Sequence, residues 1–217
     1  PDKVENRLYC NLTTEQASLY EAVVKDVAEQ LEEEDGIARQ GLMLSTLMKL
    51  KQICNHPAQF LQDESAFSES RSQKLQRLSE MLEEAMADGD SVLVFSQFTE
   101  IGDKLQAFLR GKQIPTYYIH GGVSRNKRQK MIDEFQSSDS GPAVFILSIK
   151  AGGAGITLTK ANHVFHFDRW WNPAVEDQAT DRAFRIGQKK NVFVHKFVTL
   201  GTLEEKIDQM IEDKKKI

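Results

Sequence analysis

Residues 143–173 read AVFILSIKAGGAGITLTKANHVFHFDRWWNP, and this stretch decides the fold. It contains two apolar runs, AVFIL at 143–147 and VFHF at 164–167, with a glycine-rich segment between them. Short, continuous apolar runs are typical of strands in a parallel sheet, because helices cover both faces of such a sheet. The stretch therefore predicts two buried strands.

Outside this stretch the same rhythm continues from Lys74 onward. Further strands are predicted at 92–95, 116–119 and 192–198, and helices at 75–87, 99–110, 124–136 and 173–185. Strands that alternate with helices favour a three-layer α/β domain with a mainly parallel sheet and right-handed crossovers.

The two ends of the chain are predicted to be helical. Thr13 and Gln16 form a capping box before one amphipathic helix, and a second helix closes at Asn55–Pro57. A polar linker follows at 62–73, and Thr202 and Glu205 offer a capping box for a C-terminal helix. We therefore expect a helical region at 1–72, the α/β lobe at 73–200 and a terminal helix at 201–217.

The bulk composition is that of an ordinary globular protein. The chain has 217 residues, 40% hydrophobic and 28% charged, with a net charge of −4. Nucleic-acid binding would therefore need a local basic surface. Cys10 and Cys54 form no CxxC pair, and we find neither a signal peptide nor an apolar run long enough for a membrane span. We expect an intracellular protein and, because it begins at Pro1 without Met, a fragment of a longer chain.

Unusual segments follow the predicted strands. They contain Ser96–Thr99, His120–Ser124, Ser148–Gly155 and Asp168–Pro173. Ligands of open α/β sheets bind beyond the carboxyl ends of the strands, where glycine loops and helix N-termini offer free N–H groups to anions. We therefore expect a phosphate-lined track, although each loop taken singly suits a plain turn, and the basic run 125–130 suits a solvated helix face.

The predicted helix 173–185 has the clearest candidate residues. Asn172 is a good N-cap, and Gln178, Asp181, Arg182 and Arg185 fall on one polar face. That face suits an ordinary surface helix, but guanidinium groups also match phosphate oxygens. No metal site is expected, because the histidines lack carboxylate or thiolate companions at ligand spacing.

The sequence contains no GxxxxGK[ST] motif and no acidic motif at the end of a strand. Such a chain cannot cradle the β- and γ-phosphates of a nucleotide and Mg²⁺ by itself. Arginines that serve phosphoryl transfer here would have to reach across an interface.

Several long motifs resemble those of the second, C-terminal RecA-like lobe of SWI/SNF-type ATPases in helicase superfamily two. They are LKQICNHP (50–57), VLVFSQF (92–98), YYIHGGVSRNKRQKMIDEFQ (117–136), LSIKAGGAGITLTKANHVFHFDRWWNP (147–173) and QATDRAFRIGQ (178–188). The resemblance implies a RecA-like α/β/α lobe with an N-terminal helical segment and a C-terminal brace helix.

It also implies roles for particular residues. Arg182 and Arg185 would be arginine fingers, Gln178 and Asp181 would share their motif in coupling the lobes, and Gly155 would approach the nucleotide. The implied DNA contacts are Ser96, Gln97, Gly121, Gly122, Ser148, Lys150, Ala151, Gly152 and Trp171. Trp171 could instead be a half-buried aromatic that supports the helix start. Phe184 and Thr157 depart from the common His and Asn of these motifs.

The function that the resemblance implies is the second motor lobe of a DNA-stimulated ATPase that translocates along double-stranded DNA. ATP and Mg²⁺ would be bound mainly by a first lobe, so the fragment alone would be inactive. Its partners would be duplex DNA, that N-terminal lobe and a DNA-bound protein being displaced, with no membrane. The compartment would be the bacterial cytoplasm or a nucleus, and the compact chain favours a prokaryotic source. Half of a strand-separating helicase, or a stand-alone phosphate-binding module, remain alternatives.

Overall fold

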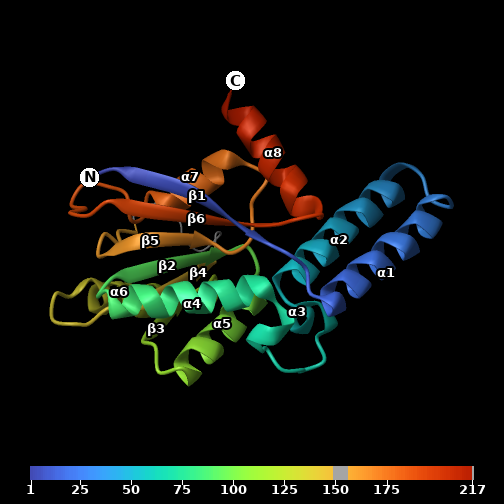
Figure 1. Cartoon of the computed structure of the whole chain (residues 1–217). Coiled ribbons are helices and arrows are strands. Elements are labelled where there is room, and N and C mark those ends of the chain that lie inside the picture. Colours follow the sequence, from blue (N-terminus) through green and yellow to red (C-terminus); the bar gives the residue numbers. More distant parts are fainter. Residues whose placement is uncertain (149–155, 217) are drawn as a thin grey trace.

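The computed structural model describes residues 1–148 and 156–216 (Figure 1). In chain order its elements are β1 Lys3–Cys10, α1 Thr14–Leu31, α2 Gly36–Asn55, α3 Pro57–Leu61, the 3₁₀ turn η1 Glu69–Arg71, α4 Gln73–Ala87, β2 Ser91–Ser96, α5 Thr99–Gly111, β3 Thr116–Ile119, α6 Arg125–Gln136, β4 Val144–Ser148, β5 Ala161–His166, α7 Pro173–Thr180, β6 Val192–Thr199 and α8 Leu203–Lys215. Within these ranges, no helix combines the length and apolar character needed to cross a bilayer.

The strands form one six-stranded sheet in the order β1-β6-β5-β2-β4-β3, and every neighbouring pair is parallel. The five predicted strands are confirmed with small shifts of their ends. β1 was not predicted, because residues 1–72 were interpreted as a helical region. It pairs with β6 along its whole length, from Lys3 beside Val192 to Cys10 beside Thr199. Only Leu8 and Cys10 of this edge strand are buried, so its apolar pattern is too weak to reveal it.

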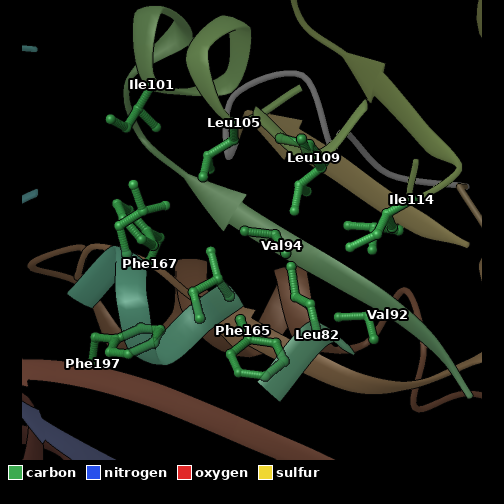
Figure 2. Packing of buried hydrophobic residues seen from close by; sticks show 14 of the residues in the cluster. Leu82, Val92, Val94, Ile101, Leu105, Leu109, Ile114, Phe165, Phe167 and Phe197 are labelled. Atoms are coloured by element: carbon green, nitrogen blue, oxygen red, sulfur yellow. The ribbon is translucent and has the colours of Figure 1, made fainter. Parts of the chain in front are cut away.

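Helices α4 and α5 cover one face of the sheet. Leu82 from α4, together with Ile101 and Leu105 from α5, packs on Val92 and Val94 of the central strand β2 (Figure 2). All five side chains have 0% exposure. Removing such a side chain would cost about 2–5 kcal/mol, since both the transfer free energy and the cavity count.

Helix α6 and the segment around α7 cover the opposite face. Phe135 of α6 packs edge-on to Phe145 of β4, with ring centroids 5.2 Å apart, and Ala179 and Ala183 join the same cluster. The sheet is therefore enclosed on both sides, which explains its continuous apolar strands.

Helices α1 and α2 form an antiparallel hairpin that projects from the sheet, and α8 returns to its base (Figure 1). Leu50 and Ile53 of α2 pack with Ile207 and Ile211 of α8 in a third apolar cluster. The expected capping box at Thr13 and Gln16 is present at the start of α1. The helical segment and the terminal helix thus share a core of their own.

The helix predicted at 173–185 ends earlier than expected. α7 closes at Thr180 with Asp181 as its C-cap, and residues 181–187 form turns that end at Gly187 with a φ of 103°. The nitrogens of Arg182 and Ala183 donate to the oxygens three residues back, of Ala179 and Thr180, as in a tightened last turn. The backbone nitrogen of Leu158 donates to the oxygen of Arg182 at 2.8 Å, and Gln188 Nε2 donates to the oxygen of Ala183 at 2.9 Å. The first of these two bonds joins the turn to the segment before β5.

Candidate functional site

The carboxyl ends of the strands meet at one edge of the sheet, as parallel pairing requires. Ser96 ends β2 and is paired with Ser148, which ends β4. The loops that follow β2, β3, β4 and β5 therefore begin at this edge, whereas the turn with Arg182 and Arg185 is bonded to residues that precede β5. Lys150, Ala151, Gly152 and Gly155 lie outside the described residues, so their predicted roles have no structural account.

The turn after α7 carries both arginines of the predicted ATP site. Arg182 is 9% exposed, and burial lowers the pKa of its guanidinium, helped by the charge of nearby Arg185. Arg185 is exposed and donates from Nη1 to the backbone oxygen of Ile156 at 2.9 Å. The turn thus folds Arg182 against the protein, whereas Arg185 faces solvent.

The remaining residues of this motif lie on the surface. Gln178 on the last turns of α7 and Asp181 at its C-cap are both exposed. The structure thus places Gln178, Asp181 and Arg185 at the solvent-facing end of α7. They no longer share one helical face, since α7 stops at Thr180.

A polar groove of about 700 Å³ adjoins the arginine-bearing turn. It is lined by Arg125, Arg128, Gln129, Ile132, Asp133 and Gln136 of α6 and by Ile156 and Thr157. Ile156 is the residue whose backbone oxygen accepts from Arg185. The basic face of α6 is therefore more than a solvated stripe, because part of it forms the wall of a groove next to the arginines.

The loop after β2 is folded inward. Ser96 is 1% exposed, and its hydroxyl donates to Asp168 Oδ2 at 2.5 Å. A DNA contact from this hydroxyl is therefore not available in the structure, and Ser96 acts as a support of the loop. Gln97 is half-buried, and its backbone nitrogen donates to Asp168 Oδ1 at 2.8 Å.

The other predicted DNA contacts in the described residues differ in exposure. Gly121 and Gly122 are exposed in the turn after β3, where the nitrogen of Gly122 donates to His120 Nδ1 at 3.0 Å. Trp171 is half-buried against the cluster formed by α2 and α8, with Lys51 Nζ 5.6 Å from its ring centroid. Ser148 is 7% exposed at the end of β4.

Several buried charged residues beside this edge received no role from the sequence. Arg169 has 0% exposure and donates from Nε to Glu176 Oε2 at 2.8 Å, and its Nη1 bonds Asp208 of α8. Burial would raise the pKa of Glu176, but His166, Arg169 and Lys196 lower it to about 2. The signal that could have found them is the pair Asp168–Arg169 directly after an apolar strand, where charges are rarely tolerated without partners.

The side chains and backbone groups around these loops indicate which ligands they could accept. Within residues 1–148 and 156–216 there is no group of three or more His, Cys, Asp or Glu side chains that could hold a metal ion. The exposed donors at the edge are guanidinium groups, amides and backbone nitrogens, which suit phosphate oxygens.

Comparison with known proteins agrees with this arrangement. Residues 73–187 match the family described as "Helicase conserved C-terminal domain". YwqA of Bacillus subtilis, provisionally named an ATP-dependent helicase/translocase, is 45% identical over 99% of this chain. The human DNA excision repair protein ERCC-6 is 36% identical over 95% of it. The chain spans only 23% of YwqA and 14% of ERCC-6.

Solved structures give the same answer. The Sulfolobus solfataricus SWI2/SNF2 ATPase core in complex with dsDNA superposes with a TM-score of 0.87 at 44% identity, covering 100% of this chain and 45% of that one. The SWI2/SNF2 ATPase C-terminal domain of the same organism gives 0.84 at 41% identity, covering 100% of this chain and 88% of that one. The chain therefore belongs to the helicase conserved C-terminal domain family, as a RecA-like C-terminal lobe of the SWI2/SNF2 type.

Proposed function

We propose that the chain is the second motor lobe of an ATP-dependent double-stranded-DNA translocase, in which Arg182 and Arg185 complete an ATP site on a first lobe. The observation that carries the proposal is the turn 181–188. It holds both arginines beside the segment that leads into β5: Arg185 Nη1 donates to the oxygen of Ile156, and the oxygen of Arg182 accepts from the nitrogen of Leu158, next to the groove of α6.

The proposed ATP contact rests on the positive charges of Arg182 and Arg185. Two guanidinium groups separated by a short turn can meet the γ-phosphate of a nucleotide and stabilise the charge that develops during phosphoryl transfer. The described residues offer no acidic cluster for Mg²⁺. A first lobe would hold the metal and the phosphate cradle, and Gln178 and Asp181 would face that lobe from the exposed end of α7. Gly155 is proposed to approach the nucleotide.

The DNA side rests on the loops at the carboxyl edge of the sheet. Gln97, Gly121, Gly122, Trp171 and the segment Ser148–Gly152 are proposed to follow one DNA backbone, with Ser96 as support. N–H groups in the first turn of α5 suit phosphate oxygens. The SWI2/SNF2 core solved with dsDNA supports this assignment. The functional division is proposed to be a helical region at 1–72, the motor lobe at 73–200 and a brace at 201–217, with β1 contributed to the sheet by the first of these.

The decisive experiment uses the full-length protein. We expect duplex DNA to stimulate its ATP hydrolysis, and a bound third strand to be displaced from a triplex as the enzyme moves. An assay for separation of a forked duplex distinguishes the alternative of a strand-separating helicase, which would release the single strands. A full-length protein that binds DNA but hydrolyses no ATP would instead favour a phosphate-binding module. An intracellular location follows from these ligands.

A further inference from the structure

Gln97, in the loop between β2 and α5, is held at both its ends by buried charged side chains. Its backbone nitrogen donates to Asp168 Oδ1 at 2.8 Å, and its Oε1 accepts a hydrogen bond from Lys51 Nζ. Asp168 and Lys51 have 0% exposure. Burial of an ionised group is costly unless partners compensate it. Two buried charges that converge on one loop residue therefore indicate that the position of this loop matters.

The hydrogen bonds around Asp168 fit its ionised form. Its Oδ2 accepts from Ser96 Oγ at 2.5 Å and from Asn55 Nδ2 at 3.0 Å. Lys74 Nζ donates to Asn55 Oδ1 at 3.0 Å, and because an ammonium only donates, the Asn55 amide must turn its NH₂ group toward Asp168. Ser96 Oγ already accepts from the nitrogen of Phe98, so its hydrogen also points to the carboxylate. All these neighbours donate.

Lys51 joins the loop after β2 to the segment after β5. Besides Gln97, its ammonium donates to the backbone oxygen of Arg169 at 2.8 Å and lies 5.6 Å from the ring centroid of Trp171. A cation at this distance from an indole face is attracted to it. One buried ammonium thus touches two of the four loops that carry proposed DNA contacts.

The same network extends to α8. Lys74 Nζ donates to Glu204 Oε2 at 2.8 Å, and Glu204 Oε1 accepts from the nitrogen of Thr199 at 2.9 Å. Asn55, Lys74 and Glu204 are each at most 2% exposed. A continuous buried path of hydrogen bonds therefore leads from the first turn of α8 to Asp168.

We propose that Asp168 and Lys51 are positioning residues, which hold the loops after β2 and β5 at the separation needed to contact one DNA backbone, with α8 as their support. This inference rests on the proposed DNA-binding function. Phosphates repeat at a regular spacing along a strand, so two loops on one rigid frame meet the same backbone only if their separation is fixed.

The test uses the full-length protein with Asp168→Asn and Lys51→Met. Asparagine would turn an NH₂ group toward neighbours that all donate, and methionine keeps an unbranched stem but loses the donor. We expect the duplex concentration for half-maximal ATPase stimulation to rise about tenfold in each variant. The rate at saturating DNA should change much less.

A matched control is Asp90→Asn, at the opposite edge of the sheet. Asp90 accepts from Lys190 Nζ at 2.9 Å and lies 3.3 Å from His163 Nε2, so this variant also loses a partly buried carboxylate. We expect a lower melting temperature with an unchanged half-maximal DNA concentration. This separates loss of stability from loss of loop position.

The proposal is overturned if both test variants melt earlier, as Asp90→Asn does, yet need less than about twice the wild-type DNA concentration. If Asp168→Asn does not fold, Lys51→Met decides alone by the same criterion. Direct binding of labelled duplex by the wild-type protein distinguishes failure of the proposed function from failure of the positioning role. Absence of wild-type binding contradicts the proposed function itself, whereas normal wild-type binding with unaffected variants contradicts only the positioning role.

Discussion

Arg185 donates from Nη1 to the backbone oxygen of Ile156 at 2.9 Å, so the arginine-bearing turn is bonded to the segment that follows the glycine-rich motif. The two motifs are separated by α7 and β5 in the chain, and only the folded sheet brings them together. This bond orients one guanidinium group of the turn, while Arg182 is 9% exposed. The two arginines therefore differ: Arg185 is exposed and bonded to the backbone of Ile156, whereas Arg182 is buried.

In the full-length enzyme, Arg182→Ala and Arg185→Ala should each lower kcat for ATP hydrolysis about a thousand-fold or more, because arginine fingers stabilise the charge of the transition state. Steady-state hydrolysis at saturating DNA and ATP checks this. Lys189→Ala, an exposed cation just beyond the turn, is the matched control and should retain activity. Normal turnover in both arginine variants would remove them from the site.

The isolated chain should hydrolyse no ATP, with or without duplex DNA, since neither a phosphate-binding loop nor an acidic metal motif occurs in its sequence. Phosphate release by the purified fragment measures this. Its weak DNA binding should fall steeply with salt, because phosphate contacts release counterions. Robust turnover, resistant to further purification, would contradict the two-lobe site.

Gly102→Ala should destabilise the lobe by about 1–3 kcal/mol, because a Cβ at this position overlaps the ring of Tyr118. The ring has little freedom to move, since Tyr118 is 5% exposed and its hydroxyl donates to the oxygen of Thr99 at 2.7 Å. Gly111→Ala, in the same helix with open space around it, should instead be neutral or stabilising by about 0.5–1 kcal/mol. Urea unfolding of both variants provides the comparison, and equal midpoints would contradict it.

Gln16→Ala should cost about 2 kcal/mol, since this one side chain serves two helix ends. Its Oε1 accepts from the nitrogen of Thr13 at 3.0 Å, and its Nε2 donates to the oxygen of Ile53 at 2.8 Å, in the last turn of α2. Gln30→Ala, on the exposed end of α1, is the control and should change the free energy of unfolding little. An equal loss of unfolding free energy in both variants would contradict a specific contribution from the two hydrogen bonds of Gln16.

Stability should fall as the pH drops from about 6.5 to about 4. Burial, together with the charges of His163 and Arg77, lowers the pKa of His195 to about 4. The unfolded chain binds a proton near pH 6.5 while the folded chain resists until pH 4, so the stabilisation is complete above 6.5 and is lost toward 4. The stabilisation that is lost amounts to ~3 kcal/mol. Urea unfolding from pH 7.5 to 4 should show a shallower decline for His195→Gln, and an unchanged slope would contradict this assignment.

Much of the lobe could be predicted because its signals are local. The buried strands are continuous apolar runs, and β3 was predicted with the bounds that the structure has, Thr116–Ile119. The capping box at Thr13 and Gln16 depends on residues three positions apart, so it could also be predicted from the sequence. β1 was missed because an edge strand with two buried side chains carries little periodicity.

The roles of the candidate site residues stay predictions, and the shape of the site came only from the structure. Motif spacing predicts roles for Arg182, Arg185 and the loops after the strands. It could not reveal that Ser96 turns inward to Asp168, or that Lys51 approaches Trp171, since these contacts join residues more than seventy positions apart.

The alternation of strands and helices and the family could be predicted from the sequence, because they depend on local periodicity and on short motifs. The absence of a phosphate-binding motif predicts a second source of phosphate and metal binding. The tertiary structure was needed to show that α7 ends at Thr180 and that the turn after it is bonded to Leu158. It also decided that the buried charges Asp168 and Lys51 converge on Gln97. Hydrogen bonds between distant segments compete with local preferences only once the sheet has formed.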